Sequence, residues 1–302
     1  MRVLLTGAGG QLGRALRLAA PADAALRVLG HAELDIADAD AIERAFRESA
    51  PQAVINAAAF TRVDAAEEAP EAAARANATG AQLLAAACAR HGAWLTHVST
   101  DFVFDGRQGH PYSSDARPNP LSVYGRTKLE GERAVARELP HQSTVVRASW
   151  LYSATGGFLG RMLALMRTRS ELSVVSDQVS SPTAAGGLAA VLWALSNRRV
   201  PGLWHWCDSG AASWYDFAVA IAEEAVLLKL LPAAPAIIAI GTAEYPTAAA
   251  RPAYSLLDKR PTERLLGMRA PHWRTALRET LGRPECVASA SARLPGGAGG
   301  AA

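Results

Sequence analysis

The sequence has few cysteines, no long apolar run and no excess of charge of one sign. Its three cysteines, Cys88, Cys207 and Cys286, lie far apart and form no C-x-x-C pair, which argues against a disulfide framework. The 302 residues include 31 basic and 28 acidic side chains, for a formal net charge of +3. This near balance gives no reason to expect a nucleic acid or an anionic membrane as partner.

No stretch is suited to a membrane. The most apolar later segment, 226–240, is interrupted by Lys229, Pro232 and Pro235 and is too short to span a bilayer. The chain begins directly with a strand-like run and shows no signal peptide, so we predict a soluble, cytoplasmic protein. Residues 283–302 lack the apolar side chains that offset ordering entropy, and we predict a disordered tail there.

A glycine-rich turn follows the first apolar run. Residues 2–6 predict a short buried strand, and Gly7, Gly10 and Gly13 then lead into a helical pattern over 14–19. Strand, glycine turn and helix form the context that a phosphate-binding loop requires, because glycine admits close approach of a ligand and the helix N-terminus offers free N–H groups. We predict a dinucleotide pyrophosphate at this turn. The alternative is a plain tight connection between strand and helix.

Strand and helix patterns alternate through the rest of the first half. Strands are predicted at 26–29, 53–56 and 93–98, and helices at 38–49 and 71–90. This alternation is typical of a parallel, doubly wound sheet, so the predicted fold class is α/β and Rossmann-type. The second half predicts strands at 144–147 and 202–206 and helices at 158–167, 183–196 and from a Ser213 cap to about 229.

In this architecture, the loop after the second strand contacts the adenosine ribose. No acidic residue ends that strand, because Gly30 and His31 stand there. Glu33 and Asp35 follow, and each either contacts the ribose or adenine side or is a solvated loop acid. A missing acid removes the usual repulsion of a 2′-phosphate, so we predict that NADPH is accepted at least as well as NADH. Small residues over 57–61 either admit a flat cofactor or serve helix–sheet packing.

The stretch from Ser99 to Lys128 carries the candidate chemistry. Thr100 and Asp101 follow the strand predicted at 93–98, at the sheet edge where ligands bind in open α/β folds. Tyr124 and Lys128 are four residues apart, and a helix over 121–137 would place both on one face. An ammonium beside a phenol lowers the phenol pKa from about 10 and makes it a usable proton donor. The alternative is that this spacing arose by chance.

Several motifs occur in order along the chain. They are T-G-x-x-G-x-x-G at 6–13, Asn-Ala-Ala-Ala at 56–59, Ser-Thr-Asp-Phe-Val-Phe-Asp-Gly at 99–106 and Tyr-x-x-x-Lys at 124–128. Together they resemble the extended short-chain dehydrogenase/reductases. The runs at 118–125, 147–152 and 245–252 are similar to the dTDP-4-dehydrorhamnose reductase family, and the resemblance covers about residues 1–282.

The resemblance implies a fold and a reaction. It implies an NAD(P)-binding Rossmann domain over 1–150, completed by part of 175–210, and a smaller discontinuous C-terminal substrate domain mainly over 151–282. A hydride passes from NADPH, or NADH, to the C4 ketone of dTDP-4-dehydro-6-deoxy-L-mannose and gives dTDP-L-rhamnose. The implied partner is therefore a dTDP-4-keto-6-deoxy sugar, in the last step of dTDP-rhamnose biosynthesis, a pathway of lipopolysaccharide and O-antigen formation.

The resemblance also implies residue roles. Tyr124 protonates the C4 oxygen, Lys128 holds the nicotinamide ribose and lowers the Tyr124 pKa, and Thr100 stands in for the superfamily's catalytic serine. The residues expected to bind the cofactor are Gly7, Gly10, Gln11, Leu12, Gly13, His31, Asp35, Ile36, Ala57, Ala59, Phe60, Thr61, Tyr124 and Lys128. Those expected to bind substrate are Thr100, Asp101, Phe102, Trp150 and Arg251.

The chain departs from the family in two places. Some members bridge their subunits through a metal held by glutamates, but Ala15 stands at one such position and 181–190 contains no acid. We therefore predict no metal, and a homodimer without a bridging ion. Tyr254 precedes Ser255 where the family usually has Asn, which bears on the nucleotide contacts.

Two other functions fit the same motifs. One is a non-catalytic, cofactor-binding regulatory subunit, as serves methionine adenosyltransferase in eukaryotes. The other is a related nucleotide-sugar reductase or epimerase. Retention of Thr100, Tyr124 and Lys128 argues against the first, and the runs at 99–104 and 245–252 favour the reductase over the epimerase.

Overall fold

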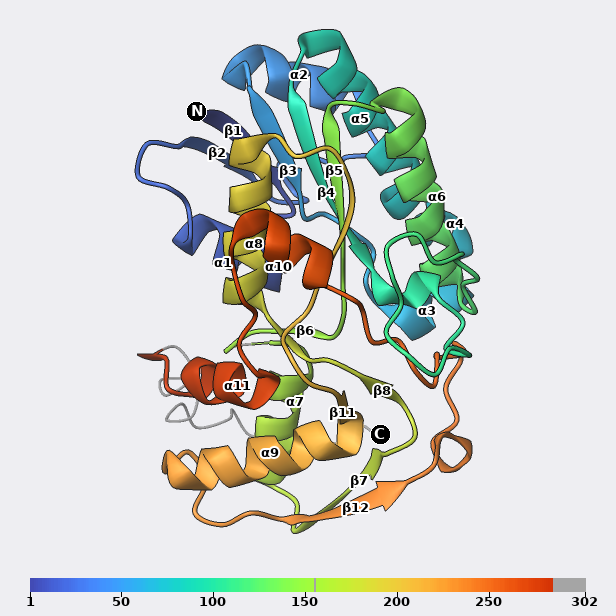
Figure 1. Cartoon of the computed structure of the whole chain (residues 1–302), viewed down its shortest axis with the longest axis vertical. Helices are drawn as coiled ribbons and strands as arrows, with labels where there is room; N and C mark the ends of the chain where they lie inside the picture. Colours follow the sequence, from blue (N-terminus) through green and yellow to red (C-terminus); the bar gives the residue numbers. More distant parts are fainter. Residues whose placement is uncertain (155, 285–302) are drawn as a thin grey trace.

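The centre of the molecule is a six-stranded parallel sheet (Figure 1). The computed structural model describes residues 1–154 and 156–284. The sheet has the strand order β10-β5-β4-β3-β1-β2, and each neighbouring pair is parallel. Its strands are β1 (Arg2–Thr6), β2 (Ala25–Leu29), β3 (Ala53–Asn56), β4 (Trp94–Thr100), β5 (Ser143–Ala148) and β10 (Gly202–Trp206). All six predicted strands are confirmed, with ends shifted by at most two residues.

Helices cover both faces of this sheet. On one face lie α2 (Ala39–Ser49), α5 (Gly80–His91) and α6 (Val123–Glu138), and on the other lie α1 (Gln11–Leu18), α8 (Ala185–Arg198) and α10 (Arg260–Leu266). Because side chains alternate along a strand, Leu4 packs under α2, α5 and α6, while Val3 and Leu5 pack under α1, α8 and α10 on the opposite face. The doubly wound, Rossmann-type prediction is confirmed.

The predicted single helix over 71–90 is wrong in its middle. The chain forms α3 (Val63–Glu68), α4 (Pro70–Ala74), a π turn η1 (Arg75–Thr79) and then α5. The π turn carries Asn77, whose side chain hydrogen-bonds both the backbone N–H and the C=O of Phe60. Gly131 of α6 packs so closely on this turn that a Cβ there would lie 2.2 Å from the Asn77 oxygen. These tertiary contacts override the regular helix that the residue propensities favour.

A second apolar core lies beyond the carboxyl edge of the sheet. Its elements are β6 (Leu151–Tyr152), α7 (Gly157–Met166), β7 (Glu171–Val175), α9 (Trp214–Leu227), β12 (Ala236–Ile240) and α11 (Trp273–Leu281). Short connecting elements are η2 (Asp101–Val103), β8 (Val179–Ser180), β9 (Thr183–Ala184), β11 (Ala212–Ser213) and η3 (Thr242–Glu244). Ser213 caps α9 as predicted, in a reciprocal capping box with Asp216, and the helix ends two residues earlier than expected.

Two predictions concern parts or properties beyond these elements. The predicted disordered tail falls on 283–302, of which 285–302 lie outside the described residues. Within the ranges that the structure does describe, no helix has both the length and the apolar character needed to cross a membrane.

Candidate active site

Four strand ends meet at one edge of the sheet. Because β1, β3, β4 and β5 run in parallel, their carboxyl ends place Gly7, Ala57, Thr100 and Ser149 along the same edge. In doubly wound folds this edge is where ligands bind. The structure thus brings the glycine turn, the small-residue loop and the Ser-Thr-Asp motif to one place.

The glycine turn has the geometry of a phosphate cradle. Gly7 adopts a φ of +68°, and a Cβ there would lie 2.4 Å from the backbone nitrogen of Ala58. A Cβ on Gly13 would lie 2.4 Å from the Gly7 oxygen, so α1 packs tightly against the turn. Gly10 is the N-cap of α1 and no side chain caps that helix, which leaves its first N–H groups directed at the edge. The buried Leu12 anchors α1 in the core.

The other residues predicted to bind the cofactor differ in their exposure and in their partners. Asp35 is half-buried, and its carboxylate lies 2.6 Å from the exposed Arg75 guanidinium of the π turn, so its contact with the ribose stays a prediction. The side chain of Ile36 belongs to the core, so any cofactor contact from that residue would come from its backbone. His31 is exposed, and Gln11 accepts a hydrogen bond from Ser153 at 2.9 Å.

The small-residue loop is held in place by a residue that sequence reasoning missed. Asn77 accepts from the Phe60 N–H at 2.8 Å and donates to the Phe60 oxygen at 3.1 Å and to Thr127 at 3.1 Å. Thr127 lies on α6 between Tyr124 and Lys128, so Asn77 joins the loop to the candidate catalytic helix. Asn77 sits in an alanine-rich helical run, and no local signal marks it. Ala57 and Ala59 are half-buried on this loop, and Thr61 is exposed.

Tyr124 lies in the first turn of α6, next to Thr100. Ser122 caps the helix by accepting from the Gly125 N–H at 3.1 Å, and the Phe102 ring meets the Tyr124 ring edge-on at 5.9 Å. Burial raises the pKa of Tyr124 to about 12, and a hydrogen bond with the Thr100 hydroxyl opposes that rise. The phenol is therefore protonated at neutral pH and is positioned to donate.

Lys128 does not have the effect on Tyr124 that we predicted. Its Nζ donates to the Val98 oxygen at 2.7 Å and lies 3.5 Å from Nε2 of His97, and its charge is not among the influences that shift the Tyr124 pKa. Burial lowers the pKa of Lys128 itself to about 8, with Glu132 opposing. The expected lowering of the Tyr124 pKa is therefore wrong, because α6 directs the lysine toward Val98 of β4.

His97 is a second residue that sequence reasoning missed. Thr6, Asn56 and His97 are neighbours on β1, β3 and β4. Asn56 Oδ1 accepts from Thr6 at 2.6 Å and from the Ala58 N–H at 3.1 Å, so its Nδ2 faces His97 Nδ1 at 3.0 Å. Burial and the neighbouring Lys128 hold the pKa of His97 well below its usual range. We assign His97 as neutral, with Nδ1 accepting and its proton on Nε2.

Asp101 is buried and held by a residue from the far end of the chain. Ser255 donates to Asp101 Oδ2 at 2.5 Å, and Thr100 donates to Oδ1 at 3.2 Å. Burial raises the pKa of Asp101 to about 7, against these hydrogen bonds. The C-terminal run that contains Ser255 therefore reaches the carboxyl edge of the sheet.

Trp150 lies between β5 and β6, in a conformation that is unusual for a large residue. Its φ is +41°, in the left-handed region, and its ring stacks on that of Trp214 with centroids 3.5 Å apart and an interplanar angle of 7°. Trp214 opens α9 and donates to Gln178 at 3.2 Å. Strain of this kind persists only where the surroundings over-determine it, and it is frequent at functional sites. One face of Trp150 is thus covered by the second core.

The structure places Arg251 differently from our expectation of a ligand side chain. Its guanidinium forms a two-pronged contact with the Asp64 carboxylate of α3, at 3.0 and 2.6 Å. A direct contact of Arg251 with substrate therefore stays an untested prediction, while its contact with Asp64 is a feature of the fold.

A buried ion pair lies next to the carboxyl ends of β4 and β5. Arg147 on β5 and Glu132 on α6 are joined at 2.8 and 2.6 Å, and Ser99 donates to the same carboxylate at 2.5 Å. Arg147 also lies over the Phe104 ring, 5.1 Å from its centroid. Removing one partner of such a pair leaves a buried charge uncompensated, so this cluster is a rigid base for β4.

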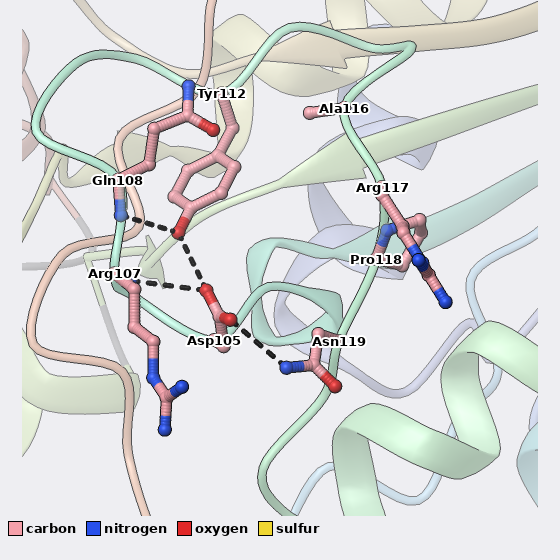
Figure 2. A pocket seen from close by; sticks show the side chains of 8 residues that line it. All are labelled: Asp105, Arg107, Gln108, Tyr112, Ala116, Arg117, Pro118 and Asn119. Atoms are coloured by element: carbon pink, nitrogen blue, oxygen red, sulfur yellow. Dashed lines mark hydrogen bonds between the residues drawn. The ribbon is translucent and has the colours of Figure 1, made fainter.

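A separate hollow of about 580 Å³ lies beside the loop that follows the Phe-Val-Phe run (Figure 2). Asp105 accepts there from Tyr112 at 3.1 Å, from Asn119 at 3.0 Å and from the Arg107 N–H at 3.1 Å. These groups bind one another and so hold the loop together. None of the side chains predicted to act on cofactor or substrate lines this hollow.

No metal centre is visible in the part of the chain that the structure describes. Within 1–154 and 156–284, no group of three or more His, Cys, Asp or Glu side chains could hold an ion. The prediction of a metal-free protein was made from sequence and stays a prediction for the assembled protein.

Comparison with known proteins identifies relatives over nearly the whole chain. A family described as the RmlD substrate binding domain matches residues 1–285. A dTDP-4-dehydrorhamnose reductase of Aggregatibacter actinomycetemcomitans is 40% identical over 286 residues, covering 92% of this chain and 97% of the relative. A probable dTDP-4,6-dihydroxy-2-methyloxan-3-one 4-ketoreductase of Streptomyces antibioticus is 40% identical over 298 residues, covering 96% and 97%.

A solved structure agrees with this relationship. The dTDP-4-dehydrorhamnose reductase of Bacillus anthracis, in complex with NADP, matches with a TM-score of 0.87 and 34% identity. The match covers 93% of this chain and 98% of that one.

Proposed function

The chain belongs to the RmlD substrate binding domain family, and on that premise we propose that it reduces dTDP-4-dehydro-β-L-rhamnose to dTDP-L-rhamnose with NADPH. The observation that carries the proposal is the placement of Tyr124 beside Thr100 at the carboxyl edge of the sheet. A protonated phenol and a hydroxyl at that edge are the groups that reduction of a ketone requires. The reductases among its relatives supply the identity of the sugar.

The residues at the edge fit a dinucleotide. The cradle at Gly7 would be closed by any Cβ, and the uncapped N-terminus of α1 offers N–H groups to a pyrophosphate. Gly30 and His31 themselves carry no acid, although the Glu33 carboxylate accepts from the Gly30 N–H at 2.6 Å, and Arg75, paired with Asp35 at 2.6 Å, adds a cation beside this loop. These features support NADPH as the cofactor. When bound, the nicotinamide supplies the hydride that reaches the C4 carbon of the sugar.

Thr100 and Tyr124 act on the carbonyl oxygen. Negative charge develops there as the ketone is reduced, and the two hydroxyls stabilise it by donating hydrogen bonds, for which Thr100 turns its one proton from Asp101 Oδ1 to that oxygen. Because burial raises its pKa to about 12, Tyr124 keeps its proton until that charge appears and then transfers it to the oxygen. Lys128, held by Val98 and faced by His97, is assigned to the ribose hydroxyls at this edge.

The second core contributes the sugar side of the site. Trp150 joins the sheet edge to that core, and its face opposite Trp214 offers an apolar wall to a pyranose ring. Asp101, with Ser255 behind it, offers a carboxyl group beside Thr100. We assign 1–150, β10 and α8 to cofactor binding and the second core to substrate binding.

The test is a direct assay. The purified protein is incubated with NADPH and dTDP-4-dehydrorhamnose, the loss of nicotinamide absorbance is followed, and the product is identified by chromatography. Turnover to dTDP-L-rhamnose supports the proposal. NADPH binding without reduction of any dTDP-4-keto sugar would favour the regulatory-subunit alternative.

A related ketoreductase is the second candidate function. The Streptomyces antibioticus relative, whose name describes reduction of a different dTDP-4-keto sugar, shares the same 40% identity. Running both substrates in parallel separates the two, because the preferred sugar shows the higher kcat/KM. Stereochemistry of the product at C4 then completes the assignment.

A further inference from the structure

Arg251 and Asp64 form a compact contact between segments that are distant in the sequence. Arg251 Nη1 lies 3.0 Å from Asp64 Oδ1, and Nη2 lies 2.6 Å from Oδ2. Nη1 also donates to the Thr247 hydroxyl at 2.6 Å and to the Ala249 oxygen at 3.0 Å. The Ala249 N–H in turn donates to Asp64 Oδ1 at 3.1 Å. One carboxylate thus organises a turn of the C-terminal segment.

The C-terminal segment is anchored at two points of the candidate site. Residues 247–251 dock on Asp64, and four residues further along Ser255 donates to Asp101 beside Thr100. Between these anchors, Pro252 and Ala253 pack against Gly106 so closely that a Cβ on that glycine would lie 2.7 Å from the Ala253 nitrogen. Backbone hydrogen bonds of Val179 with Ala253 and Ser255, at 2.8 and 2.9 Å, hold the later part of the segment as well. Residues 247–251 are therefore the part whose placement depends most on Asp64.

The element that carries Asp64 also contacts the catalytic helix. Helix α3 follows directly on the loop 57–61, and its Glu67 accepts from the Val123 N–H at 2.8 Å, at the first residue of α6. Asp64 and Glu67 are three residues apart and share a face of α3. The helix is thus joined to the cofactor loop, to the turn that bears Tyr124 and to the C-terminal segment.

The contact between Arg251 and Asp64 is partly exposed, so it contributes little to stability and acts mainly by fixing the position of the C-terminal segment. The Arg251 side chain is 20% exposed and that of Asp64 is 45% exposed. The Arg251 guanidinium lowers the pKa of Asp64, which keeps the carboxylate charged at neutral pH. A planar guanidinium on a carboxylate fixes direction as well as distance.

We propose that Asp64 is a positioning residue, and that Arg251 acts through it to hold residues 247–255 over the sugar site instead of binding the substrate directly. The proposal rests on the proposed function, because the sugar nucleotide is the ligand whose site the segment covers. It assigns a role to α3 and changes the role that Arg251 was expected to have.

A double-mutant cycle tests the proposal. Asp64→Ala, Arg251→Ala and the double variant are assayed for kcat and for KM of the sugar nucleotide, with Glu68→Ala, an exposed acid on the same helix, as control. We expect each single change to raise KM by about tenfold, corresponding to loss of one charged hydrogen-bonded contact, with kcat within about threefold of the parent. The double variant should be no worse than Arg251→Ala, and the control should match the parent.

Additive effects would overturn the proposal. If Arg251 binds the substrate directly, Arg251→Ala costs far more than Asp64→Ala and the two losses multiply in the double variant. A parent protein without any reductase activity would instead show that the proposed function fails. Thermal unfolding of the parent, the two single variants and the double variant then tests whether Asp64 and Arg251 interact in the folded protein. Shifts in Tm that do not add support the pair, and additive shifts contradict it.

Discussion

Tyr124, Lys128 and Asp101 share an environment in which burial is the largest influence on each pKa. Burial raises the pKa of Tyr124 to about 12 and that of Asp101 to about 7, and it lowers that of Lys128 to about 8. Each shift favours the neutral form of the group. Tyr124, the proposed proton donor, is therefore kept neutral by desolvation, and in the proposed reaction the charge that draws its proton away develops on the ketone oxygen.

Asp101 makes the stability of the folded protein depend on pH. Its folded-state pKa of about 7 lies above the ordinary value of 3.8. Between these values the folded protein keeps a proton that the unfolded chain releases, so the contribution to stability is full below about pH 4 and is lost as the pH rises through about 7. For Asp101→Asn, which cannot titrate, we expect a shallower loss of unfolding free energy over this range, by at most about 4 kcal/mol.

Thermal unfolding of the parent and of Asp101→Asn across this pH range checks the expectation. Asp208, whose carboxyl is also buried with a raised pKa of about 7, is present in both proteins and cancels in the difference. Parallel curves for the two proteins would show that Asp101 titrates normally in the folded state.

At the scale of elements, the π turn joins the small-residue loop 57–61 to α6, the candidate catalytic helix. Asn77 makes three hydrogen bonds there, two to Phe60 and one to Thr127. Its replacement leaves the part-buried N–H and C=O of Phe60 without their partner, and each such loss costs up to about 1–3 kcal/mol.

Asn77→Ala should therefore lower the unfolding free energy by about 2–4 kcal/mol and raise the Kd for NADPH. Gln82→Ala on α5 is the matched control, because Gln82 makes one part-buried hydrogen bond, to Glu138. Urea unfolding and a fluorescence titration with NADPH supply the two readouts. Equal effects of the two substitutions would contradict the role given to the π turn.

The elements differ in how well the sequence predicts them. Buried strands such as β1 and β5 are apolar runs with clear ends, and Asp38 and Ser213 mark helix starts by their capping side chains. The π turn was not predictable, because the reason for it lies in Phe60 and Thr127, outside the helix. Helix α3 is too short to show a periodic pattern.

In the site, too, features set by local sequence motifs were predictable, and contacts between distant segments were not. The positions of the glycine turn, Thr100 and Tyr124 in the fold were predictable, because each is set by a motif at the end of a strand or the start of a helix. The partners of Lys128 and Arg251 were not, because His97 and Asp64 are brought to them by the packing of distant segments. Burial likewise follows from the whole fold, which is why the direction of the Tyr124 pKa shift was missed.

At the scale of the whole molecule, no metal is expected to hold the assembly together. The described ranges contain no group of three or more His, Cys, Asp or Glu side chains that could hold an ion, and Ala15 and 181–190 supply no carboxylate, so a bridging Mg²⁺ would have too few hard oxygen ligands. EDTA should leave both turnover and the mass measured by light scattering unchanged. Dissociation or inactivation on chelation, reversed by added Mg²⁺, would show that the assembled protein does bind a metal.

The carboxyl edge of the sheet is faced by a second core, and Tyr124 lies beside Thr100 at that edge. The central claim is that Tyr124 delivers the proton to the ketone. Tyr124→Phe keeps the packing of the ring and removes only the hydroxyl, and Tyr215→Phe, on α9 beside the second core, is the matched control.

The most direct measurement is the turnover of these two variants and the parent on dTDP-4-dehydrorhamnose, with NADPH affinity measured alongside. A positioned general acid contributes about 10²–10⁴-fold, so kcat of Tyr124→Phe should fall by that factor while NADPH binding and the control variant stay as in the parent. Near-parental turnover by Tyr124→Phe would contradict the account.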